Sequence, residues 1–124
     1  MADITLSITG NIARGSLNQS VLATGVTADM ASTGMMATTL QLGTATTQIN
    51  TANMSTLGYA FARSLVTSTA VTATVSFGRL VAGTLYEACT LRPGEVAALR
   101  LSPGDYAAKA AAAGLPMVVE IFEG

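Results

Sequence analysis

The side chains best suited to chemistry in this sequence are one cysteine and two pairs of acidic residues. Cys89 is the only cysteine, so it cannot form an intrachain disulfide, and a single thiolate cannot make a zinc site. Glu87 with Glu95, and Glu120 with Glu123, could supply the two carboxylates that acid–base catalysis uses. In an extended strand, however, residues three apart point to opposite faces, so the second pair is not expected to share a cleft.

These residues also have ordinary structural interpretations. Cys89 fits a small buried residue of a strand, and Glu120 and Glu123 fit the solvated ends of an edge strand that deter aggregation. The chain has no histidine, which removes His-based catalysis and His-ligated metal sites. The glycines from Gly10 to Gly15 lack the Lys-Ser/Thr ending of a phosphate loop. We therefore expect no enzyme activity, no metal, no cofactor and no small-molecule substrate.

The composition narrows the classes of partner. Charged residues make up 10% of the chain, against roughly 25% in an ordinary soluble domain. The net charge is −1 and the six basic residues form no run, so nucleic acid is not an expected partner. No stretch of 18 apolar residues occurs, and the opening MADITLSITG does not resemble a signal peptide. We expect synthesis in the cytosol, no membrane span, and a surface that is either rich in Thr, Ser and Gly or covered by other subunits.

The charges are unevenly distributed along the chain. Nine of the thirteen lie between Arg79 and Glu123, whereas residues 30–62 carry none. One interpretation of this uncharged segment is a low-complexity surface with flexible loops; the other is a surface packed against another protein, which small and Met side chains suit. Met residues there could also fill the core. The candidate interface residues are Met30, Met35, Met36, Leu40, Leu42 and Met54.

Several windows alternate apolar and polar residues with a period of two, which predicts strands. The first begins at Ile4 and is expected to break at Gly10-Asn11, and another covers residues 36–42 and ends at Gly43. Residues 59–66 alternate in the same way, and residues 71–77 form the clearest window, expected to end at Gly78. Val, Thr and Phe favour a half-buried pleated surface, so β structure is expected throughout.

The segment LRPGEVAALRLSPGD, residues 91–105, repeats a Pro-Gly step after ten residues. Pro followed by Gly fits a type II turn, because Pro sets φ at the second position and Gly allows the positive φ at the third. About six residues remain between the turns, which suits a strand and is too short for a stable helix. Val96, Ala98 and Arg100 are then expected on one face, with the intervening residues on the other.

Residues 105–116 permit two interpretations. The alanines, Asp105 as an N-cap and Gly114 with Pro116 as a stop would suit a short helix. We favour a strand from Tyr106 to Lys109, a loop and a return strand, because a helix of two turns is marginal unless packed. The sequence thus predicts an all-β fold, an antiparallel sandwich or jelly roll of short strands with Pro-Gly turns. It is expected to be one domain, residues 1–124, with residues 1–29 either part of the sandwich or an arm that contacts neighbouring subunits.

The second half of the chain also resembles a known class. A Gly-Tyr-aromatic strand, an Arg-Pro-Gly-Glu turn, a Leu-Ser-Pro-Gly turn and an acidic-aromatic ending occur in the same order in small structural proteins of tailed bacteriophage particles. Ala62 stands where those proteins often carry a second aromatic residue, and the interval from Ser64 to Leu91 is longer here. The segments that carry the resemblance are TLGYAFARSL (56–65), LRPGE (91–95), LRLSPG (99–104) and VEIFEG (119–124).

The resemblance implies a β-rich structural component of a phage particle, present in many copies. The resemblance does not distinguish a component of the head from one of the tail. Taken together with the uncharged segment, it leads us to expect a capsid decoration or cement protein that forms a homo-oligomer, a trimer, and binds the major capsid protein at the capsid surface of the virion after assembly in the host cytoplasm. The alternative is a tail fibre or spike module that binds a host receptor or carbohydrate. A small cytosolic enzyme or ligand-binding barrel is a third class, which the lack of histidine and of a polar cluster disfavours.

Overall fold

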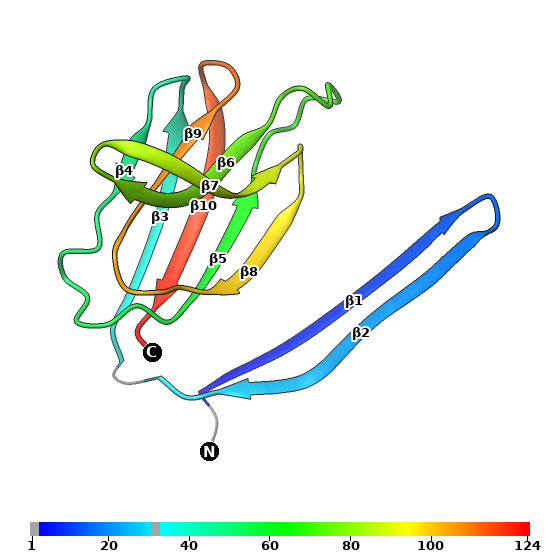
Figure 1. Cartoon of the computed structure of the whole chain (residues 1–124), viewed down its shortest axis with the longest axis horizontal. Coiled ribbons are helices and arrows are strands. Elements are labelled where there is room, and N and C mark those ends of the chain that lie inside the picture. Colours follow the sequence, from blue (N-terminus) through cyan, green and yellow to red (C-terminus); the bar gives the residue numbers. More distant parts are fainter. Residues whose placement is uncertain (1–2, 31–32) are drawn as a thin grey trace. The chain divides into compact units, whose positions relative to one another are not determined.

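The computed structural model describes residues 3–30 and 33–124, and these residues form ten β-strands (Figure 1). The chain divides into two compact units, residues 1–31 and residues 32–124. The first contains a two-stranded hairpin, and the second contains two four-stranded sheets. In the described part of the chain there is no helix of the length and apolar character that crossing a membrane requires. The prediction of an all-β fold is confirmed, and the sandwich strands all come from the second unit.

The hairpin pairs β1 (Ile4–Arg14) with β2 (Leu17–Ala28) in antiparallel register. A two-residue turn, Gly15-Ser16, joins them, with a φ of 59° at Gly15, and glycine at the first turn position suits the twist of a hairpin. The predicted break at Gly10-Asn11 is wrong, because Gly10 pairs with Val21 and the strand continues to Arg14. A single glycine weakens a strand but does not remove its backbone hydrogen bonds.

The sandwich consists of two sheets in which all neighbouring strands are antiparallel. The first, called here the β10 sheet, has the order β3 (Met35–Leu42), β10 (Leu115–Phe122), β5 (Tyr59–Ser64) and β8 (Val96–Arg100). The second, called the β9 sheet, has the order β4 (Thr47–Ile49), β9 (Asp105–Ala110), β6 (Val75–Val81) and β7 (Thr84–Leu91).

The core consists of the inward-facing residues of both sheets. In β10 the alternation is complete: Met117, Val119 and Ile121 are fully buried, and the residues between them are partly exposed. Phe77 of β6 is also fully buried, and its ring stacks on that of Tyr106 of β9, with centroids 5.6 Å apart. Burial of this apolar surface is the main stabilising contribution to the fold.

The two Pro-Gly steps behave differently. Gly94 has a φ of 78°, and the backbone N–H of Glu95 donates to the carbonyl of Arg92 over 3.0 Å, as the predicted type II turn requires. Gly104 has a φ of 145°, so the prediction of a second type II turn is wrong. There the Tyr106 hydroxyl donates to the carbonyl of Ser102 over 2.7 Å, which holds the chain ahead of β9. The strand between the two steps is β8, as predicted.

Two other sequence predictions concern β6, β9 and β10. β9 and β10, joined by a turn at residues 111–114, confirm the strand interpretation of residues 105–116. The window predicted at residues 71–77 is displaced: β6 begins at Val75 and continues through Gly78 to Val81. The pairing of β6 with β7 has a β-bulge at Phe77/Gly78. The backbone of β7 approaches Gly78 so closely there that only a residue without a side chain fits.

Candidate functional site

The acidic pair at the C-terminal end of β10 is structural. Glu120 faces outward, whereas Glu123 is only 4% exposed and accepts hydrogen bonds from the backbone N–H (2.6 Å) and the hydroxyl (3.0 Å) of Ser55. The backbone N–H of Glu123 also donates to the carbonyl of Gly34 over 3.0 Å. The interpretation of these two residues as solvated ends of an edge strand is therefore wrong, because β10 lies between β3 and β5 and Glu123 is buried.

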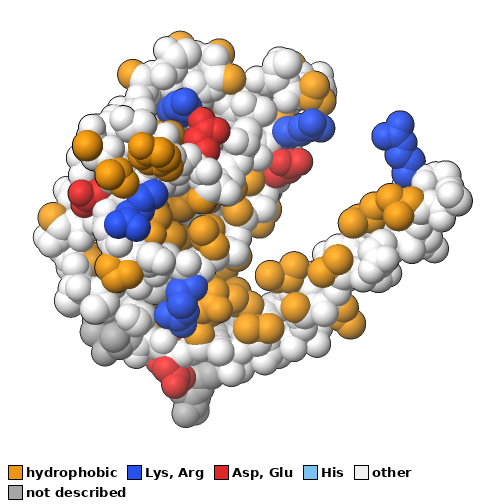
Figure 2. All heavy atoms as spheres, viewed as in Figure 1, with side chains coloured by type: hydrophobic (Ala, Val, Ile, Leu, Met, Phe, Trp, Pro, Cys, Tyr) orange, Lys and Arg blue, Asp and Glu red, His pale blue; other side chains and the backbone are white. Residues whose placement is uncertain are grey.

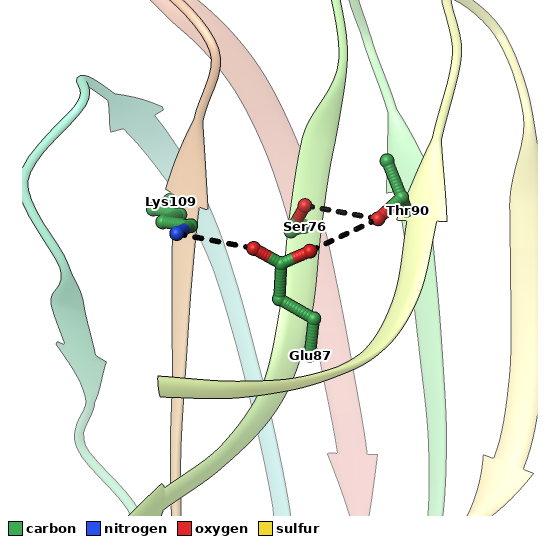
Figure 3. A network of polar contacts seen from close by, with 4 residues as sticks. All are labelled: Ser76, Glu87, Thr90 and Lys109. Carbon is green, nitrogen blue, oxygen red and sulfur yellow. Dashed lines mark hydrogen bonds and ion pairs between the residues drawn. The ribbon is translucent and has the colours of Figure 1, made fainter. Parts of the chain in front are cut away.

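The other acidic pair is divided between two separate interactions. Glu87 forms an ion pair with Lys109 (Oε1 to Nζ, 3.1 Å) and accepts a hydrogen bond from the hydroxyl of Thr90 (3.3 Å) (Figure 3). The hydroxyls of Thr90 and Ser76 lie 3.2 Å apart and extend this network across β7 and β6. Glu95 instead accepts a hydrogen bond from the backbone N–H of Arg92 over 2.8 Å. The two carboxylates therefore take part in separate interactions.

The Glu87 network predicts a small dependence of stability on pH. The hydrogen bond from Lys109, together with its charge and the bond from Thr90, lowers the pKa of Glu87 below its ordinary value of 4.5. A lowered pKa in the folded state adds stability above pH 4.5 that is lost as the pH falls through the folded-state pKa. Both side chains are 39% exposed, so solvent screening limits the effect to less than about 1 kcal/mol.

We therefore expect Glu87→Gln to reduce the free energy of unfolding slightly at pH 7, and the difference from the wild type to disappear in strong acid. Urea unfolding of both proteins across this pH range measures the effect. Glu95→Gln is the control, because it removes a carboxylate that accepts its hydrogen bond from a backbone N–H. A loss of several kcal/mol in Glu87→Gln would contradict the assignment of this network to the solvated surface.

The remaining candidates for chemistry are also structural. Cys89 of β7 is half-buried, and burial raises the pKa of its thiol, which lowers its reactivity near neutral pH. Within residues 3–30 and 33–124, no group of three or more His, Cys, Asp or Glu residues could hold a metal ion. Five hollows on the described surface have volumes of about 270 to 440 Å³ and are open, and one of about 440 Å³, beside Met54, is lined mainly by loop residues.

The predicted interface residues fall into two groups. Leu42 is 1% exposed and is part of the core, and Met36, Leu40 and Met54 are partly buried against it. Met30 is half-buried, and its backbone N–H donates to the carboxylate of Asp3 over 2.9 Å. Met35 is 56% exposed, so within this set it alone presents a largely free side chain. The alternation of β3 explains the division, because Met36, Leu40 and Leu42 share the inward face.

The outer side of the β10 sheet carries apolar and aromatic side chains together with three charged ones. The strand register places outward side chains of four neighbouring strands side by side, with Phe122 opposite Met35 and Phe61 opposite Ala98. The Phe61 and Phe122 rings meet edge to face at 5.8 Å, and Arg100 lies over the Tyr59 ring at 4.7 Å. This surface is called here the outer β10 face, and Glu120 lies within it between Ala37 and Phe61. Its residues are Met35, Ala37, Thr39, Tyr59, Phe61, Arg63, Val96, Ala98, Arg100, Val118, Glu120 and Phe122.

The outer side of the β9 sheet also carries charged side chains. It carries the network of Glu87, Lys109, Thr90 and Ser76, the kind of charged and hydroxyl surface that a sandwich normally presents to water. On the outer β10 face, Val96 is 66% exposed, and a hollow of about 270 Å³ is lined by apolar and aromatic side chains and also by Arg63 and Glu120. Both sides of the sandwich therefore carry charged side chains, and the outer β10 face adds a group of aromatic rings.

The hairpin has a second apolar surface. Paired residues share a face, and most apolar residues of β1 and β2 fall on the same one; the polar face has Leu22 as its one large apolar side chain. The hairpin apolar face, as the term is used here, comprises Ile4, Leu6, Ile8, Ile12, Leu17, Val21, Ala23 and Val26. Ile8, Ile12, Leu17, Val21 and Val26 are each more than 40% exposed. Figure 2 shows hydrophobic side chains along the hairpin.

A β-bulge keeps the hairpin apolar face continuous. Leu6 pairs with Val26 and Ile8 with Ala23, so β2 has one extra residue over this interval. Gly25 lies in it with a φ of 66°, a conformation that suits glycine. If β2 alternated regularly over the same residues, Val26 would lie on the polar face, because it is three positions from Ala23 and an odd step reverses the side chain. The bulge thus gathers the apolar side chains of both strands on one face.

Sequence reasoning did not identify either surface. The alternation of apolar and polar residues in 4–14 and 17–23, with Gly15-Ser16 as a two-residue turn between them, could have predicted the hairpin and its apolar face. The outer β10 face is assembled from four strands that are distant in the sequence, so no local pattern reveals it. No known protein family, curated protein or solved structure matches this chain.

Proposed function

We propose that this chain is a homo-oligomeric structural subunit of a virus particle, a capsid decoration or cement protein. The observation that carries the proposal is the hairpin apolar face. A two-stranded hairpin is marginally stable in water by itself, and β1 and β2 are about twice as long as typical strands. Five large apolar side chains exposed in a row on such a hairpin would stabilise it only when another surface covers them.

The low charge supports the same function. Between Asp3 and Asp29 the hairpin carries one charged residue, Arg14 next to the turn, so little opposes its transfer from water to a protein surface. A cement protein acts by binding only the assembled shell, which it stabilises by mass action. Many copies that each bury an apolar hairpin face would hold neighbouring subunits together. No bound substrate or catalytic group is needed for this role.

The order of the strands supports a jelly-roll form of the sandwich. Every connection from β3 to β10 crosses between the two sheets except the β6–β7 hairpin. Numbered from β3, the strands have the orders 1-8-3-6 and 2-7-4-5, which we infer to be the wrapped arrangement of a double-sheet jelly roll. That fold occurs in viral capsid domains and also in lectins, and a fold alone does not specify a function.

Because the jelly roll also occurs in lectins, a tail fibre or spike module that binds a host receptor or carbohydrate is the second candidate. The aromatic residues Tyr59 and Phe61, with Arg100 over the Tyr59 ring, are of the types that stack on sugars. They pack against one another on a sheet instead of standing on loops, which favours a protein partner. Specific binding on a glycan array would support the second candidate, and the absence of binding would favour the first.

The experiment that tests the proposal is the solution mass of the purified protein, measured by size-exclusion chromatography with light scattering. We expect a closed oligomer, a trimer, with three times the 12.5 kDa mass of one chain. Co-sedimentation with undecorated capsids then tests the binding to a shell. A protein that stays monomeric at micromolar concentration and does not sediment with capsids would overturn the proposed function.

A further inference from the structure

We propose that β3 of one copy pairs, antiparallel and across a two-fold axis, with β3 of a second copy. This inference goes beyond the proposed function, because a trimer contains no two-fold contact and the pairing would join a copy in one trimer to a copy in the next. β3 is an edge strand of the β10 sheet: β10 lies on one side of it, and in the described part of the chain no strand pairs with the other side (Figure 1). Another extended strand fits such an edge, because it supplies matching N–H and C=O groups.

β3 is the least protected of the four edge strands of the sandwich. Proteins usually block an edge by keeping the strand short or by placing charged residues, proline or a β-bulge in it. β4 has three residues, β7 carries Glu87 and has a bulge in its pairing with β6, and β8 has five residues and ends at Arg100. β3 has eight residues, no charged side chain, no proline and a regular register with β10. It therefore has none of these devices against pairing with another strand.

The hydrogen bonds to β10 determine which backbone groups of β3 face the free edge. The N–H of Glu123 donates to the carbonyl of Gly34 over 3.0 Å, on the β10 side. Because the direction alternates along an antiparallel strand, every second residue counted from Gly34 points at β10. Pro116, opposite Gln41, has no N–H to donate, which agrees with this assignment. The residues whose N–H and C=O groups face the free edge are Met35, Ala37, Thr39 and Gln41.

One register pairs all of these backbone groups. With the two-fold axis at Thr38, Met35 lies opposite Gln41 of the second copy, and Ala37 lies opposite Thr39 of the second copy; symmetry adds the two reverse pairs. Each of these pairs exchanges two hydrogen bonds, about eight in total, which is within the usual number at a protein–protein interface. A shifted register would leave residues at the ends of β3 without an opposite residue in the partner strand.

The side chains also fit in this register. On the inner face of the sheet, Met36 lies opposite Leu40 of the second copy, and the two copies of Thr38 lie opposite each other. Apolar pairs and Thr–Thr pairs of this kind stabilise neighbouring strands. Met36 and Leu40 are only partly buried against the core and line a hollow of about 350 Å³. The pairing would therefore cover apolar surface that a single copy leaves open, and it brings no two charges together.

The size of this contact determines where it acts. A contact made by one pair of strands is small, so it is expected to form reversibly in dilute solution. Copies held side by side on a shell meet at a high effective concentration, which strengthens a weak contact. The pairing would then link neighbouring oligomers into a network across the shell. In solution, a covalent trap is needed to detect it.

Disulfide trapping in the full chain tests the contact and its register. Thr38→Cys places two thiols at the two-fold axis, where the Cα atoms of a pair without mutual hydrogen bonds are about 4.5 Å apart, a distance that suits a disulfide. Thr39→Cys is the matched control on the next residue, because its two copies would lie about 7–8 Å apart, too far for a disulfide. Both changes are made in a Cys89→Ala background, so that the engineered thiol is the only one. Oxidised glutathione supplies the oxidant, and far-UV circular dichroism checks that each variant folds.

The readout is the rate at which a covalent dimer forms, followed by non-reducing gel electrophoresis. We expect Thr38→Cys to form it at least about 10-fold faster than Thr39→Cys, because only the first pair is within disulfide distance. Adding Thr39→Pro to Thr38→Cys removes an N–H that faces the free edge and keeps the pairing with β10, so it should slow the cross-link about 10- to 100-fold, as two hydrogen bonds per dimer are lost. Ala98→Pro, which removes an N–H from the free edge of β8, is its control and should leave the rate unchanged.

Each other outcome has a definite meaning. Equal rates for Thr38→Cys and Thr39→Cys would overturn the register and the inference with it. If the wild type is an oligomer and Thr38→Cys does not cross-link, another segment covers β3 or the copies associate elsewhere, which overturns this inference and leaves the proposed function in place. If Thr38→Cys cross-links as expected but the wild type neither forms a closed oligomer nor sediments with capsids, the inference stands and the proposed function fails. A monomer that neither cross-links nor binds capsids overturns both.

Discussion

Replacing Phe77 with alanine is expected to lower the free energy of unfolding by about 3–5 kcal/mol, the range for removing a large buried aromatic side chain. Phe77 is fully buried between the two sheets and stacks on Tyr106, so the variant loses apolar burial and leaves a cavity that neighbouring strands cannot fill. Urea unfolding followed by circular dichroism measures the difference. Both proteins are compared at one concentration, because association adds to apparent stability.

Tyr86→Ala is the matched control for this prediction. Tyr86 is also aromatic and lies on β7, the strand paired with β6, but its side chain is largely exposed. We expect its loss to change the free energy of unfolding by no more than about 1 kcal/mol. Equal effects of Phe77→Ala and Tyr86→Ala would show that the region between the sheets is not the core.

Replacing Gly78 with alanine is expected to cost about 3 kcal/mol or more, at the upper end of the range for overpacking. A Cβ at this position would overlap the carbonyl oxygen of Tyr86 and lie 2.7 Å from the backbone nitrogen of Ala88. These are backbone atoms of β7, so they cannot move as a side chain would. The β-bulge must open and part of the β6–β7 pairing must separate. Thermal unfolding and amide hydrogen exchange in β7 measure the two consequences.

Gly43→Ala controls for the chemical change itself. A Cβ added at Gly43 would meet no described atom within 4 Å, and Gly43 does not have the positive φ that favours glycine. Adding a methyl group there should be neutral within about 0.5 kcal/mol. If Gly78→Ala is equally neutral, β7 does not approach β6 as closely as the bulge indicates.

The parts of the fold that the sequence predicted are those governed by short-range rules. The alternation of residues 36–42 and the Pro-Gly spacing around Val96 both identified strands correctly, because a period of two and a two-residue turn are local properties. Gly10 and Gly78 produced the same error. In each case a paired strand continued through a glycine, and only the partner strand reveals that.

The candidate site was less predictable than the fold. The uncharged segment correctly suggested that some Met side chains fill the core, but it did not separate Met35 from Met36, whose exposure depends on the strand's orientation. Glu123 was expected in water, and its burial against Ser55 arises from a contact between residues 68 positions apart. Surfaces assembled from distant strands depend on strand order, which no local pattern encodes.

The central place of β10 affects how the protein is made. A ribosome synthesises β3 well before β10, yet in the finished sheet β10 lies between β3 and β5. Until β10 is synthesised, the edges of β3 and β5 that will pair with it are unpaired, and other nascent chains or chaperones can bind them. Such long-range pairing gives a high contact order and slow folding. Cells producing this protein rapidly should therefore accumulate it in inclusion bodies unless synthesis is slowed or the temperature lowered.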